Sequence, residues 1–154
     1  MKTQVPPEIQ ETPTPDLSAA EVKQPTKPKY DKDELLTIFD EIIFSGEYRE
    51  DVSIKNKLKV TFRSRSADDI NAISKELDSG TYNLISTLQE KTAFLNVVHS
   101  VVSYSGKDLA PMNSDAKKAF FGKLPAVVIG AISQALITFD AKVAAACMEG
   151  EENF

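Results

Sequence analysis

Residues 54–66 read IKNKLKVTFRSRS, in which apolar side chains alternate with basic or hydroxylated ones. Successive side chains of a β-strand point to opposite faces, so this alternation predicts a strand with one apolar and one cationic face. The apolar face would hold Leu58, Val60 and Phe62. The basic residues, which we call the cationic ladder, are Lys55, Lys57, Lys59, Arg63 and Arg65, with Thr61 between them.

The same stretch predicts a β-hairpin over about 48–65. We expect strands at about Arg49–Ile54 and Leu58–Ser64, joined at Lys55-Asn56-Lys57, because asparagine tolerates the positive φ of tight hairpin turns. A lone hairpin is marginally stable in water, so its apolar face must pack on helices or extend a larger sheet. Three acidic residues are placed to pair with the ladder across the hairpin: Glu47, Glu50 and Asp51.

Helical patterns lie on both sides of the hairpin. Before it, Leu35, Ile38, Phe39, Ile42 and Ile43 recur at helical spacing. Asp31 followed by Glu34 resembles a capping box, and Gly46 is a plausible helix end. After the hairpin, helices are expected at about 66–79, 82–104, 114–121 and 125–148. The predicted fold class is mainly α with a small β-hairpin (α+β): a helix, the hairpin, then about four helices.

Composition divides the chain into three parts. Residues 1–29 hold six of the eight prolines and few apolar residues, which predicts an extended arm that is flexible or becomes ordered on a partner. Residues 30–148 are expected to form a single helical domain, because 42% hydrophobic residues suffice for one core. Residues 149–154 form an acidic tail.

Charge and composition exclude several classes of protein. A net charge of −5 and a pI near 5.0 argue against general affinity for nucleic acid. The single cysteine, Cys147, excludes an intramolecular disulfide and a cysteine-rich metal site. The longest apolar run, Ala126–Ala135, is expected to be too short to span a bilayer, and the N-terminus lacks the apolar segment of a signal peptide. We therefore expect a soluble protein without a membrane partner.

The search for catalytic chemistry finds little. His99 and Cys147 are the only residues of their types and lie on different predicted helices. His99 is expected to be a packed, hydrogen-bonded helix histidine and Cys147 a small helix residue. The carboxylate clusters at 31–34 and 68–69 begin predicted helices, where the helix dipole favours acidic side chains without a metal. We expect no enzyme activity, no cofactor and no metal; a metal-dependent hydrolase stays a minor alternative.

The cationic ladder has three interpretations. It is the solvated, partly ion-paired face of a sheet, a docking surface for an acidic protein, or a contact to nucleic acid. Single-stranded nucleic-acid platforms interleave exposed aromatic residues with the basic ones, whereas Phe62 lies on the opposite face of the predicted strand. The ladder is therefore a candidate partner-binding site that acts through charge.

Three later segments carry a resemblance to a known group of proteins. They are VTFRSRSADD at 60–69, LQEKTAFLNVVHSVVSYSGKDL at 88–109 and FFGKLPAVVIGAISQALITFDAKV at 120–143. In order and spacing they resemble the small tail or baseplate-hub assembly proteins (chaperones) of tailed bacteriophages. The matching features are an "SxxSxxGKxL" segment at Ser100–Leu109 and a short helix that ends in Leu124-Pro125 before a long final helix. The resemblance covers about Val52–Val143.

The resemblance implies a non-enzymatic role in virion assembly. The expected partners are phage structural proteins of the tail or baseplate hub, bound through the N-terminal arm and the hairpin. The expected location is the host cytoplasm during assembly, with a place in the virion and an oligomeric state left open. The alternative function is that of a nucleic-acid-associated accessory protein that uses the basic strand at 55–65.

Overall fold

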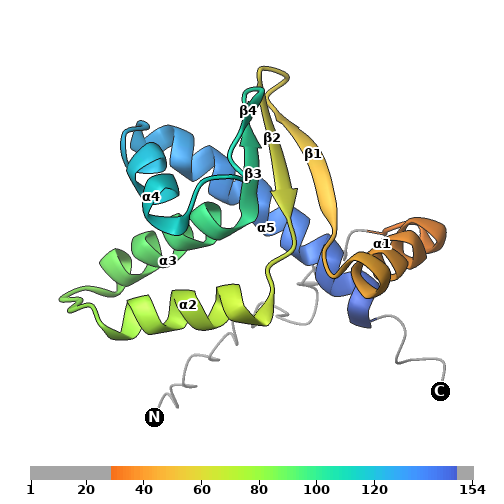
Figure 1. Ribbon diagram of the computed structural model, residues 1–154, viewed down its shortest axis with the longest axis horizontal. Coiled ribbons are helices and arrows are strands. Elements are labelled where there is room, and N and C mark those ends of the chain that lie inside the picture. Colours follow the sequence, from red (N-terminus) through yellow and green to blue (C-terminus); the bar gives the residue numbers. More distant parts are fainter. Residues whose placement is uncertain (1–28, 149–154) are drawn as a thin grey trace, which may run out of the picture.

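The computed structural model describes residues 29–148, which fold into five helices and a small antiparallel sheet (Figure 1). The elements are α1 Lys32–Ser45, β1 Arg49–Ile54, β2 Leu58–Arg63, α2 Ala67–Asp78, α3 Ile85–Ser100, β3 Val101–Tyr104, β4 Lys107–Asp108, α4 Ser114–Gly122 and α5 Ala126–Met148. The predicted mainly α, α+β fold is confirmed. The arm expected at 1–29, apart from Lys29, and the acidic tail at 149–154 lie outside the described residues.

The sheet is larger than the predicted hairpin. Its strand order is β1-β2-β3-β4, and every neighbouring pair is antiparallel. The central strand β2 aligns Val60 with Val52 of β1 on one side and with Tyr104 of β3 on the other. The prediction that residues 101–104 continue a helix is therefore wrong, because they pair with β2. This pairing also meets the requirement that a marginal hairpin extend a larger sheet.

Both hairpin turns use positive φ angles. Lys55 and Asn56 have φ of 52° and 55°, and the Lys57 N–H donates to the Ile54 carbonyl at 3.1 Å, as in a type I′ turn. This confirms the predicted turn at 55–57. The β3–β4 turn repeats the conformation, with φ of 48° at Ser105 and 82° at Gly106.

The main core lies between one face of the sheet and the helices α3, α4 and α5. Val60 and Phe62 are buried there, which confirms the predicted apolar face of β2. The Phe62 ring lies 5.6 Å from that of Phe139 on α5, and Phe121 of α4 closes another side of the same core. Fully burying such aromatic side chains contributes on the order of 2 kcal/mol each.

Helix α1 lies at one end of the molecule against the C-terminal part of α5 (Figure 1). A second, smaller core forms there from Leu35, Ile38 and Ala146. Phe39 and Ile43 belong to the apolar stripe predicted from the sequence, which would face the core, but both are exposed. The apolar positions of α1 are too many for the one side that α5 covers, so part of its apolar surface faces solvent.

Several helix termini follow local sequence signals, whereas α3 begins after Leu84 without a side-chain cap. Ser66 forms the predicted capping box with Asp69, and the side chain of Asn113 caps α4. At α1 the Asp31 carboxylate accepts the Asp33 N–H at 3.1 Å, but Glu34 does not complete a box, because it pairs with Lys142 on α5. Pro125 directly precedes α5 and does not occupy its first position.

Helix α5 is longer than the apolar run read from the sequence. Its 23 residues make the whole helix long and apolar enough to cross a membrane by length and composition, whereas the expectation from the sequence concerned only the shorter run Ala126–Ala135. One such helix is weak evidence for a membrane protein, because core helices of soluble proteins meet the same test. In the structure Ile132, Leu136 and Phe139 of α5 are buried, while Val127 and Ile137 are exposed.

Candidate functional site

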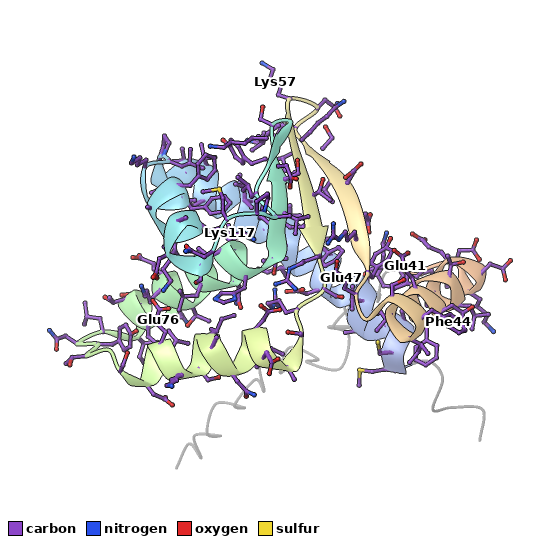
Figure 2. All side chains as sticks on the ribbon, in the orientation of Figure 1. Glu41, Phe44, Glu47, Lys57, Glu76 and Lys117 are labelled. Carbon is purple, nitrogen blue, oxygen red and sulfur yellow. The ribbon has the colours of Figure 1, made fainter. Side chains whose placement is uncertain are left out.

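The cationic ladder is divided among three environments. Lys59 and Arg63 project with Thr61 from the outer face of the sheet, opposite the core. Lys55 and Lys57 lie in the hairpin turn and are exposed at its tip, where Figure 2 shows Lys57 pointing away from the molecule. The predicted continuous row is therefore interrupted. Its role in partner binding stays a prediction.

Arg65 lies beyond the end of β2 and contacts two helices. It follows the end of β2 and turns toward the helices, where its Nη1 donates to Ser100 Oγ at 2.6 Å. Its Nη2 donates to Asp140 Oδ2 at 2.7 Å, which joins the loop after β2 to α3 and α5. This guanidinium is mostly buried and bound within the protein, so it does not belong to the exposed face of the sheet.

The expected pairing between hairpin acids and the ladder is confirmed only in part. Glu47 lies 3.7 Å from Arg63. Asp51 accepts the Thr61 hydroxyl at 2.6 Å and so pairs with the hydroxyl of that strand. The remaining acid, Glu50, points to the core side, where both carboxylate oxygens accept Lys142 Nζ at 3.0 Å.

A polar cleft opens beside the base of the sheet. It has a volume of about 330 Å³ and lies between the sheet and helices α2, α3 and α4. Six charged or titratable side chains line it: Glu47, Arg49, Arg63, Asp69, His99 and Lys117. Its other lining residues are Val98, Val102, Ala110, Met112 and Ser114. Two residues labelled in Figure 2, Glu47 and Lys117, mark positions on the sheet side and the α4 side of this region.

Asp69 is the centre of the hydrogen bonds on the α2 wall of the cleft. It accepts Arg63 Nη2 at 2.9 Å, the Ser66 N–H at 2.9 Å and His99 Nδ1 at 3.1 Å. Burial alone would raise the pKa of this carboxyl, but these hydrogen bonds hold it well below its usual range. The prediction of a packed, hydrogen-bonded His99 is confirmed.

Lys117 forms the opposite wall and is the residue that the sequence did not reveal. It is only 8% exposed, and its Nζ donates to the backbone carbonyl of Val101 at 3.1 Å. Within residues 29–148 this ammonium forms no ion pair at 4.0 Å or less. Burial lowers its pKa, and the nearby Arg63 guanidinium lowers it further. Asp69 and Asp108 act on this pKa in the opposite direction, but among residues 29–148 neither lies within ion-pair distance of the ammonium.

A different surface lies on α1, far from the cleft. Four apolar side chains, which we call the α1 outer face, are exposed to solvent: Leu36, Phe39, Ile43 and Phe44. Positions 36, 39 and 43 share one side of the helix by their spacing, and Phe44 is 86% exposed. The acidic Asp33 and Asp40 border this face. A large exposed apolar patch with a polar border is typical of a protein contact surface.

The carboxylate clusters noted in the sequence serve as helix caps. Asp31 caps α1, and Asp69 belongs to the box that begins α2. Among residues 29–148, no group of three or more His, Cys, Asp or Glu side chains is placed to hold a metal ion. Cys147 is an exposed free thiol near the end of α5.

The arrangement provides two surfaces with different chemistry. The α1 outer face offers apolar area to a macromolecule, and the polar cleft offers cations to a small anionic group. Comparison with protein-family models, curated proteins and solved structures finds no match for the chain.

Proposed function

We propose that the protein is a non-enzymatic assembly protein of tailed bacteriophages that binds a component of the tail or baseplate. The observation that carries a binding role is the α1 outer face, which presents four large apolar side chains to solvent. Exposed apolar surface is favourable to bury and is the main driving force of protein association. The phage context is supported by the resemblance of the segments at 60–69, 88–109 and 120–143.

The chemistry of the α1 outer face indicates what kind of partner fits. Leu36, Phe39 and Ile43 form a stripe along the helix, and Asp40 lies beside it. Its best complement is an amphipathic helix with a matching apolar stripe, bordered by lysine or arginine opposite the acidic side. Two helices packed in this way bury both stripes and pair the charges at the rim.

The alternative function, binding of nucleic acid through residues 55–65, loses support from the geometry. Arg63 is paired with Asp69 and Arg65 with Asp140, so within residues 29–148 only the three lysines of the ladder form no ion pair. The outer face of the sheet presents Ser53, Thr61 and Ser103 between its charges. Across the described strands this face carries no aromatic side chain for base stacking.

The test is a binding experiment with the full chain and each tail and baseplate protein encoded beside it. We expect one of them to form a complex that survives size-exclusion chromatography. Ile43→Asp places a charge in the α1 outer face and is expected to weaken that complex at least tenfold in calorimetry. A tenfold loss corresponds to about 1.4 kcal/mol, which is the size expected when a charge is placed at a central contact residue of an interface.

The chain offers a matched control on another helix. Ile70 of α2 is 53% exposed and Ile43 of α1 is 62% exposed, so Ile70→Asp makes the same chemical change on a different surface. It is expected to leave the affinity unchanged. If none of the tail or baseplate proteins binds, the proposed function is wrong; if both variants bind like the wild type, the partner does not use α1.

A further inference from the structure

The charges around the polar cleft do not balance. Arg49, Arg63 and Lys117 contribute three positive charges, whereas Glu47 and Asp69 contribute two negative ones. Counted over the lining lysine, arginine, aspartate and glutamate side chains, the cations exceed the carboxylates by one; Asp108, which does not line the cleft, also attracts Lys117 from nearby. The two arginines contact Glu47 or Asp69 directly, so the excess is located at Lys117.

Lys117 has unused hydrogen-bonding capacity. A lysine ammonium has three donors, and this one makes a single hydrogen bond, to the Val101 carbonyl. The residue as a whole is more than nine-tenths buried, which limits its access to bulk water. Burying a charge is costly unless it is paired, and an anion in the cleft would provide that pair.

The beginning of α4 adds to the same wall. Ser114, the first residue of this nine-residue helix, lines the cleft next to the loop that carries Met112. The Asn113 side chain caps the Ala116 N–H, which leaves the N–H groups of the first helical residues without an intrahelical acceptor. The helix dipole therefore supports the positive potential that Lys117 creates.

We propose that the polar cleft is a binding site for a carboxylate with a short apolar substituent. Lys117 Nζ has two donors left for one monoanion, and Ser114 adds a hydroxyl to the lining. The half-buried Met112 and the exposed Ala110 provide apolar surface for the substituent. A volume of about 330 Å³ suits one such group. Its source is either a free small acid or the C-terminal residue of another polypeptide.

The proposal is tested by NMR titration of the ¹⁵N-labelled full chain with N-acetyl-leucine. We expect a Kd on the order of millimolar, as suits a small ligand held by one ion pair. The amide signals that move should be those of Ala110, Met112 and Ser114. N-acetyl-leucinamide has the same shape without the charge and should bind at least tenfold more weakly.

Substitution of Lys117 provides the second test. Lys117→Met keeps the length of the side chain without its charge and should weaken binding of N-acetyl-leucine at least tenfold, whereas Lys117→Arg should retain most of it. Lys57→Met is the matched control, because Lys57 is exposed at the hairpin tip and far from the cleft (Figure 2). If Lys117→Met does not fold, the proposal is tested by comparing the affinities of the wild-type protein for N-acetyl-leucine and N-acetyl-leucinamide.

Three results would overturn the proposal. They are equal affinity for the acid and the amide, wild-type affinity in a folded Lys117→Met variant, and inorganic phosphate binding more tightly than N-acetyl-leucine. The two sources are separated by a hexapeptide that ends in leucine with a free carboxylate. Tighter binding of this peptide than of N-acetyl-leucine assigns the site to a polypeptide C-terminus, and weaker binding assigns it to a free acid. The inference does not depend on the proposed function.

Discussion

Arg65 Nη2 lies 2.7 Å from Asp140 Oδ2 and thereby connects the loop after β2 to the middle of α5. The same guanidinium donates to Ser100 Oγ at the end of α3. One side chain thus holds three elements that are distant in the sequence. The alternation of residues 54–66 continues through Arg65 in the sequence, but the strand itself ends at Arg63.

The first prediction concerns this contact. Arg65→Gln should lower the free energy of unfolding by about 1–3 kcal/mol, because hydrogen bonds to charged groups are lost and Asp140 is left partly buried without its partner. The measurement is urea unfolding followed by circular dichroism. The double variant Arg65→Gln/Asp140→Asn should lose less stability than the two single variants added together, because the two residues interact directly.

The control for Arg65 is another member of the cationic ladder. Lys57→Gln removes one exposed positive charge at the hairpin tip and should change the free energy of unfolding by no more than about 0.5 kcal/mol. An equal loss of stability in both variants would show that the ladder acts through its overall charge. It would contradict the specific contact of Arg65.

The second prediction compares two phenylalanines. Phe62 is completely buried against Phe139, so Phe62→Ala should destabilise the protein by about 3–5 kcal/mol through lost burial and a residual cavity. Phe44 lies on the α1 outer face, and Phe44→Ala should change stability by about 0.5 kcal/mol or less. Thermal unfolding of both variants measures the difference. A large loss for Phe44→Ala would mean that this ring is covered, for example by a second copy of the chain.

The helices and the first hairpin could be predicted because their signals are local. The alternation in β2 and the capping residue Ser66 each lie within a few residues of the structure they specify. Strand β3 could not be predicted in this way. Val101 and Val102 follow α3 without a glycine or proline, and their spacing from Val97 and Val98 also fits a helix. Their pairing with a strand far earlier in the chain makes them a strand.

The polar cleft was hidden in the sequence for a similar reason. Lys117 and Lys118 are neighbours on one short helix, and no local signal distinguishes them. The structure buries Lys117 at the cleft and turns Lys118 toward Glu76, where the two ions lie 2.7 Å apart. Which lysine faces the core depends on how α4 packs against α3, and that is a tertiary relationship.

The third prediction concerns acid stability. The pKa of Asp69 is held below its usual value by Arg63, Ser66 and His99, so its ionised form stabilises the folded state. This contribution is fully present above the unfolded pKa of about 4 and is lost as the pH falls through the lower folded pKa. Asp69→Asn should therefore destabilise the protein by about 1–3 kcal/mol at pH 7, and the deficit should shrink in acid.

Urea unfolding at several pH values between 2 and 7 measures this effect, and Asp68→Asn is the control. Asp68 is the adjacent residue on α2 and is exposed, so its substitution should leave both the stability and its pH dependence nearly unchanged. If the deficit of Asp69→Asn is the same at pH 2 and pH 7, the ionised carboxylate is not what stabilises the α2 wall of the cleft.

The last prediction uses one substitution at two glycines with opposite expected signs. Gly106 has a φ of 82° in the β3–β4 turn, and Gly130 lies within α5; in both cases an added Cβ would meet no atom within 4 Å. Space is therefore not limiting, and only the backbone conformation differs. Gly106→Ala should destabilise by about 1–2 kcal/mol, because alanine is strained in the left-handed region. Gly130→Ala should stabilise by about 1 kcal/mol, because alanine favours the helix over the unfolded chain. Thermal unfolding of the two variants and the wild type shows whether each substitution raises or lowers the stability. If Gly106→Ala is neutral, the β3–β4 turn does not hold this conformation in solution.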